Sequence, residues 1–139
     1  DAGLAAFGPP ITAQQTPHTY HPVEDAPLRR VTRDLLSGKM CVTFPRWTYS
    51  KTMPDIGQTQ TATGIISHEI VDGDPCSAVT LTDYRVSMQF PQTTIHHHST
   101  GRMSCTATHF RIEMSLEIHE ADTLIFQRTW DKEIARDMV

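Results

Sequence analysis

Histidine and glutamate side chains are the residues of this chain whose spacing could support chemistry. His96 and His98 are separated by one residue, and Glu117 and His119 repeat that spacing later in the chain. Residues two apart in a β-strand point to the same face, so each pair would present its side chains together. Imidazole and carboxylate groups suit Zn²⁺ or a similar ion. Whether the two pairs meet depends on the strands that carry them.

Strict alternation indicates these strands. Apolar residues occupy every second position from Phe110 to Ile118, with polar residues between them, and the segment Thr94–Cys105 alternates less strongly. A period of two predicts strands with one buried face. His119–Asp122 forms a polar turn, after which Leu124, Phe126 and Trp130 resume the apolar pattern, with Ile125, Gln127 and Thr129 on the opposite face.

Charge selects the register of the hairpin formed by residues 94–105 and 109–119. One register that keeps the apolar faces together places Arg102 opposite Arg111, and like charges in this position are destabilising. The other places Arg102 opposite Glu113, His98 opposite Glu117 and His96 opposite His119. We predict the second register, with Thr106–His109 as the loop. The His96–His98 pair and the Glu117–His119 pair would then share one face.

The shared face has two interpretations. It could hold a metal ion, or it could be the polar, solvent-facing side of an ordinary strand pair; we favour the second and predict no metal site. His97 faces the apolar side as a hydrogen-bonded core or interface histidine. Arg128 falls between Phe126 and Trp130 on the apolar face, where it would form a rim position or an ion pair with a neighbouring domain.

Catalytic signatures are missing from the sequence. There is no Gly-x-Ser-x-Gly elbow and no glycine-rich loop that would cradle a phosphate. We therefore predict no catalytic residue, no cofactor-binding residue and no cofactor in this chain.

Composition narrows the class of protein. The net charge of −4, without a basic stripe, argues against a nucleic-acid partner. Cys41, Cys76 and Cys105 are odd in number and far apart, which predicts reduced thiols in a cytoplasmic protein. No apolar run reaches the ~18 residues of a membrane span, so no membrane partner is expected.

Two regions differ in character. Residues 1–28 contain five of the nine prolines and predict an extended arm, either a disordered tail or a strap lying on another surface. Residues 29–139 predict six or seven antiparallel strands, and only Val31–Leu36 could form a helical turn. The predicted fold class is all-β, an antiparallel β-sandwich resembling a jelly roll.

Six short motifs occur in order along nearly the whole chain: Phe7–Pro10, Arg30–Gly38, Asp74–Ala78, Met103–Phe110, Phe126–Trp130 and Ile134–Val139. Together they resemble the C-terminal region of the cocaine-esterase-like α/β-hydrolases, relatives of X-prolyl dipeptidyl peptidase. Two features depart from the family pattern: Ala135, where proline is expected, and the run His96–His98.

The resemblance implies a jelly-roll domain that follows a catalytic α/β-hydrolase domain with a Ser-His-Asp triad, packs on it and helps to wall the substrate site. The triad has no counterpart in this chain. Two hypotheses therefore stand. The chain is the non-catalytic C-terminal part or subunit of a serine hydrolase that cleaves ester or amide bonds, or it is a free-standing β-sandwich binding module that could hold a metal through its histidine-rich face.

Overall fold

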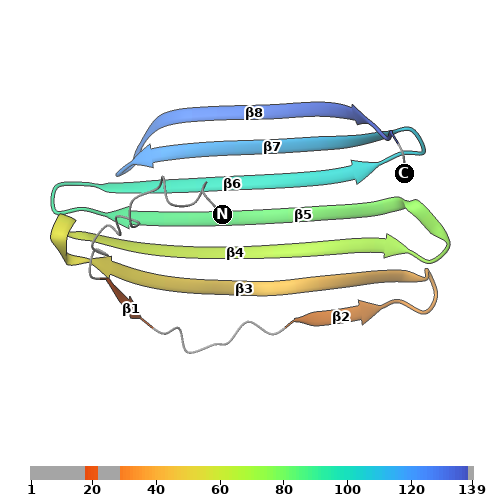
Figure 1. Cartoon of the computed structure of the whole chain (residues 1–139), viewed down its shortest axis with the longest axis horizontal. Coiled ribbons are helices and arrows are strands. Elements are labelled where there is room, and N and C mark those ends of the chain that lie inside the picture. The colour runs from red at the N-terminus through yellow and green to blue at the C-terminus, as the bar shows by residue number, and fades with distance from the viewer. Residues whose placement is uncertain (1–17, 22–28, 138–139) are drawn as a thin grey trace, which may run out of the picture.

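The described part of the chain is a single antiparallel β-sheet (Figure 1). The computed structural model describes residues 18–21 and 29–137, with the backbone alone at residues 45–47. A 3₁₀ turn, η2 (Pro54–Ile56), separates β3 from β4. The eight strands are β1 (Thr19–His21), β2 (Arg30–Arg33), β3 (Lys39–Met53), β4 (Gln58–Val71), β5 (Asp74–Gln89), β6 (Thr94–Cys105), β7 (His109–Glu120) and β8 (Thr123–Ala135).

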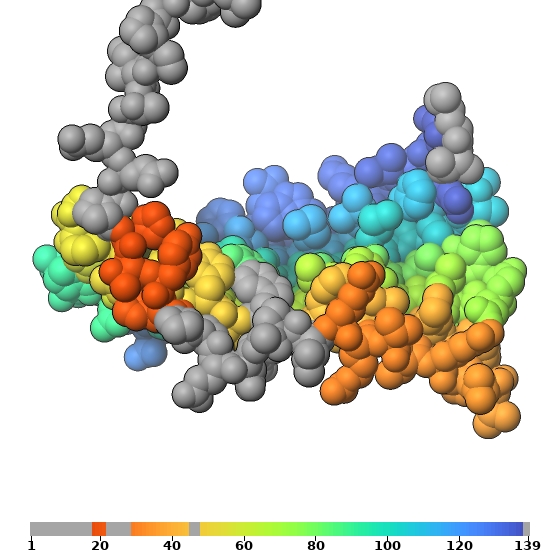
Figure 2. All heavy atoms as spheres, turned by 60° about the horizontal axis from the view of Figure 1, so that its bottom comes forward, coloured from red at the N-terminus to blue at the C-terminus, as the bar shows by residue number. Residues whose placement is uncertain are grey.

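The six long strands form a meander in which each strand pairs with the next along the chain, from β3 to β8. The two short strands β1 and β2 both pair with the outer edge of β3, and Figure 2 shows them along that edge. The predicted all-β antiparallel class is thus confirmed. A sheet of this kind is consistent with one layer of a β-sandwich.

Glycine permits two of the tight connections that the sequence indicates. Gly38 has a φ of 69° in the turn before β3, and Gly73 has a φ of 76° in the turn between β4 and β5. Both values lie in the left-handed region, which glycine enters at no steric cost. The predicted turn at Ser37–Gly38 is confirmed between β2 and β3. The predicted turn at Asp72–Pro75 is confirmed only at Asp72 and Gly73, because Asp74 and Pro75 already belong to β5.

Strand register collects most large apolar residues on one side of the sheet, which we call the apolar face. Its centre lies on β4 and β5, where Ala62 and Val86 are paired and are 1% and 7% exposed. Among the described elements, every substantial contact joins strands that are neighbours in the sheet. The apolar face includes Phe44, Tyr49, Ile66, Tyr84, Met88, Met103, Phe110, Ile112, Met114, Leu116, Ile118, Phe126, Trp130 and Ile134.

Three local predictions are corrected. Val31–Leu36 is not a helical turn: residues 30–33 are β2, paired with β3, and a turn follows. Leu124 does not share the face of Phe126, because an irregularity in the β7–β8 pairing sets Leu124 opposite His119 and Phe126 opposite Ile118. The predicted loop Thr106–His109 is shorter by one residue, since His109 begins β7.

The predicted arm lies mostly outside the described residues. Its described part, residues 18–21, contains β1, which is extended as expected and pairs with β3. Tyr20 in this strand is 63% exposed. The apolar residues Leu4, Phe7 and Ile11 of the predicted arm lie outside the described residues.

Candidate functional site

The hairpin of β6 and β7 has the register predicted from charge. Arg102 pairs with Glu113, and its guanidinium donates to the Glu113 carboxylate at 2.9 Å. His98 is opposite Glu117 and His96 is opposite His119, as predicted. The polar residues of the hairpin therefore lie together on the side opposite the apolar face, which we call the polar face.

The four candidate ligands share this face, but their side chains do not converge on one point. Within the described residues, no three histidine, cysteine, aspartate or glutamate side chains are placed to hold one metal ion. The Glu117 carboxylate accepts a hydrogen bond from the Gln127 amide at 3.0 Å. His98 is turned toward β5, where its Nε2 lies 3.2 Å from Asp83 Oδ2.

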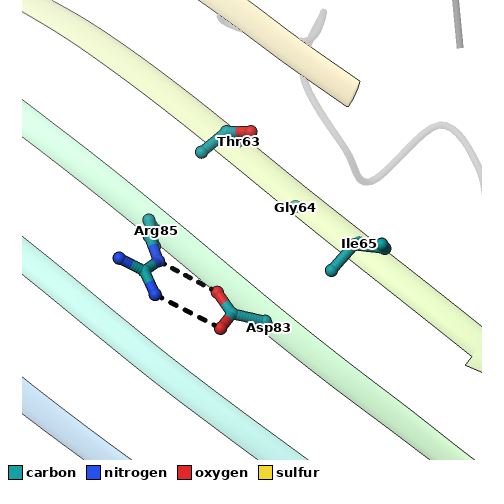
Figure 3. Close-up of a pocket in the computed structure, with 5 residues that line it drawn as sticks. All are labelled: Thr63, Gly64, Ile65, Asp83 and Arg85. Atoms are coloured by element: carbon teal, nitrogen blue, oxygen red, sulfur yellow. Dashed lines mark hydrogen bonds and ion pairs between the residues drawn. The ribbon is translucent and has the colours of Figure 1, made fainter. Parts of the chain in front are cut away.

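Asp83 and Arg85 form an ion pair on β5 (Figure 3). Together with His98 they make up a polar cluster. Arg85 Nε donates to Asp83 Oδ1 at 3.1 Å, and one Nη lies 3.5 Å from Oδ2. The Arg85 guanidinium lowers the pKa of Asp83 below its usual range, and His98 lowers it further. Asp83 is therefore a carboxylate at neutral pH.

The sequence analysis did not single out Asp83 or Arg85, because neither belongs to a recognisable motif. The signal was present: Asp83 and Arg85 occupy the polar positions between Thr82, Tyr84 and Val86. The strand pairing sets Arg85 directly opposite His98. It is this pairing, and not any motif, that joins β5 to the histidines.

A depression of about 250 Å³ lies beside this cluster on the polar face, spanning β4 to β7. Arg85, His96, His98 and His119 line it, together with hydroxyl residues of β4 and β5. A smaller depression of about 130 Å³ adjoins it, where Thr63, Ile65 and the Asp83–Arg85 pair lie (Figure 3). The arrangement offers hydrogen-bond donors to a small polar ligand.

Arg111 organises the other end of the polar face. Its guanidinium donates to Asp131 on β8 at 2.6 Å and lies 3.4 Å from Glu113. The hydrogen bond from Arg111 lowers the pKa of Asp131. These pairs are exposed, so their value lies in setting register between strands more than in stability.

The apolar face carries two of the residues that the sequence analysis singled out. Arg128 lies on it as predicted, opposite Leu116 in the pairing, with its guanidinium 5.0 Å from the centroid of the Trp130 ring. The His97 ring meets the Tyr84 ring edge-on, with centroids 5.9 Å apart. Burial lowers the pKa of His97 and raises that of Tyr84. His97 is thus favoured in its neutral form.

The three cysteines are free thiols, all half-buried. No helix among the described residues has the length and apolar character needed to cross a membrane.

Comparison with known proteins identifies no relative: no family model, no curated protein and no solved structure matches this chain.

Proposed function

We propose that this chain is the non-catalytic C-terminal β-sandwich part or subunit of a serine hydrolase that cleaves ester or amide bonds, and that it packs on the catalytic α/β-hydrolase domain. The family motifs quoted above support this proposal. The observation that carries it is the open apolar face, since a hydrophobic face of this extent marks an interaction site.

The size and chemistry of the face suit a permanent interface. The six long strands have 12–16 residues, about 14 on average. At a rise of ~3.3 Å per residue and a strand spacing of ~4.8 Å, their face spans roughly 1,300 Å². Covering that face would bury about 2,600 Å² in total from both partners, within the range of obligate complexes. Met103, Met114 and Phe126 remain 42–47% exposed in the isolated chain, so the partner would desolvate them. Arg128 beside Trp130 would then lie at or within the interface.

The direct test pairs the full chain with a purified α/β-hydrolase chain that carries Gly-x-Ser-x-Gly. We expect one complex in size-exclusion chromatography. A Met114→Lys plus Phe126→Lys variant should lose the complex, because two charges would be buried without partners. Thr129→Lys is the matched control: it lies on the polar face of β8, opposite Ser115, and should leave the complex intact.

Activity supplies the second half of this test. A hydrolase needs a nucleophile, a base and oxyanion donors held together. The isolated chain should therefore hydrolyse neither p-nitrophenyl esters nor proline-containing peptides. A monodisperse monomer that hydrolyses either substrate would contradict the proposal.

The alternative function is a free-standing binding module, and the depression on the polar face favours it. A chain that stays monomeric, inactive and well folded in the presence of the hydrolase would support this alternative. Elemental analysis tests whether this module binds a metal. A metal-binding chain would contain one equivalent of metal, and the variant His96→Ala plus His98→Ala would lose it.

A further inference from the structure

The depression on the polar face is lined by side chains that donate hydrogen bonds. Arg85 enters it from β5, His96 and His98 from β6, and His119 from β7, while Thr61 and Thr63 close the side formed by β4. No aspartate or glutamate lines it. In a chain of net charge −4, this depression is lined by a guanidinium and imidazoles and by no carboxylate.

The donors retain unused capacity. Arginine has five N–H bonds, and Arg85 uses two of them on Asp83, which leaves three. His96 and His119 face each other across the β6–β7 pairing, and neither has a hydrogen-bond partner among the described residues. Each imidazole donates at least one N–H whether neutral or charged. The site is therefore able to bind an acceptor without first breaking its own contacts.

We propose that this depression binds a tetrahedral oxyanion, such as the phosphate or sulfate group of a small molecule. The donors come from three adjacent strands, so they can bind different oxygens of one ligand. A tetrahedral group offers several oxygens to such donors, whereas a planar carboxylate offers two. The volume of about 250 Å³ also exceeds that of a bare ion, given ~30 Å³ for one water, and leaves room for the molecule that carries the group.

Two carboxylates stand near the site and oppose an anion. Asp83 pairs with Arg85 and His98, and Glu117 is opposite His98 but accepts from Gln127. Asp83 opposes an anion more strongly than Glu117 does, because it contacts two of the proposed ligand-binding side chains. Removing its charge should free both donors for the ligand. This proposal concerns the polar face and is independent of a partner on the apolar face.

The test titrates the full chain with sulfate at pH 6.0 and constant ionic strength, observing the histidine rings by NMR. We expect saturable shifts at His96 and His119. Arg85→Gln should weaken binding about tenfold, the loss expected for a charge-assisted donor. Asp83→Asn should tighten binding severalfold, and a gain cannot arise from misfolding. His109→Gln is the matched control, because His109 lies on the same face of β7 as His119 but ten residues, or about 33 Å, from it. This variant should bind sulfate as the parent does.

Two further titrations identify the ligand class. Phenyl phosphate should bind at least as tightly as sulfate, and acetate should bind more weakly than either. Equal binding of acetate and sulfate would overturn the assignment of a tetrahedral group. Unchanged sulfate affinity in Arg85→Gln, or no gain in Asp83→Asn, would overturn the site itself.

Discussion

Ala121 is the only described residue other than glycine with a positive φ, at 49°. It occupies the first position of the two-residue loop that joins β7 to β8, between the paired residues Glu120 and Thr123. Hairpin loops with a positive φ at this position favour glycine. An alanine there costs free energy through the clash of its Cβ with the backbone.

Ala121→Gly should therefore raise the free energy of unfolding by about 0.5 kcal/mol, since the relief of strain exceeds the entropy that glycine adds to the unfolded chain. Urea denaturation measures the change. Ala107→Gly in the β6–β7 loop is the control, because Ala107 has no positive φ and should only lose stability. A loss of stability in both variants would contradict this account of Ala121.

The Asp83 carboxyl group makes the stability of the fold depend on pH. Its pKa is lowered in the folded protein, first by Arg85 and then by His98. A lowered carboxyl pKa contributes stability above the unfolded value of ~3.9, and this contribution is lost as the pH falls through the folded pKa. Because Asp83 is 38% exposed, solvent screening keeps the contribution small.

Asp83→Asn should be less stable than the parent at pH 6, and this difference should shrink as the pH falls below ~4. Chemical denaturation at a series of pH values measures it. Asp122→Asn, at an acid that makes no ion pair within the described residues, serves as the control. A constant difference for Asp83→Asn across this range would show that its carboxylate contributes nothing through its charge.

Whether the sequence predicts a contact in the candidate site depends on how far apart the contacting residues lie along the chain. Arg102, Glu113 and the cross-strand histidines lie within one hairpin, so apolar alternation and charge repulsion were enough to predict their register. The contact between His98 and Asp83 depends on the pairing of β5 with β6. Asp83 and Arg85 are visible as polar positions of β5, but they do not fix the pairing of β5 with β6, so the cluster could not be assembled from sequence.

At the scale of elements, the pairing of β5 with β6 brings the backbone of one strand close to a side chain of the other. Gly101 on β6 is opposite Thr82 on β5, and a Cβ built on Gly101 would lie 2.7 Å from Thr82 Oγ1. Threonine is restricted in χ1, so its side chain moves away only at a cost. Gly101 is thus a packing requirement of this strand pair, although glycine is otherwise unfavourable within a strand.

A double-mutant cycle tests this requirement. Gly101→Ala alone should lower the free energy of unfolding by about 1 kcal/mol through overpacking. In a Thr82→Ala background the same change should be neutral or stabilising by about 0.5 kcal/mol, because alanine loses less entropy than glycine on folding. Equal losses in both backgrounds would mean that Thr82 is not the obstacle.

Element prediction failed where tertiary pairing overrides the local pattern. β2 is too short to show periodicity, and it forms because β3 offers an open edge. Leu124 continues the apolar alternation in sequence, but the irregularity near His119 shifts the β8 register by one residue. Such an extra residue leaves no mark in the composition of the strand.

At the scale of the whole molecule, the all-β class followed from alternation, but the covering of the sheet did not. Alternation shows that one face of each strand avoids water. It does not specify whether the other layer comes from the same chain, a second copy or a different protein. The described residues supply one sheet, and its buried apolar residues are limited to Ala62 and Val86.

The exposed side chains of the apolar face should tolerate charged replacements in the isolated chain. Met114 and Phe126 are 47% and 43% exposed, so replacing both by lysine removes little packing from the sheet. The double variant should unfold at nearly the same urea concentration as the parent. It should also associate less at high concentration, because its apolar patch is interrupted by charge. Sedimentation velocity and urea denaturation measure the two effects. A loss of several kcal/mol, as expected for charges placed in a packed core, would show that another part of this same chain already covers the face.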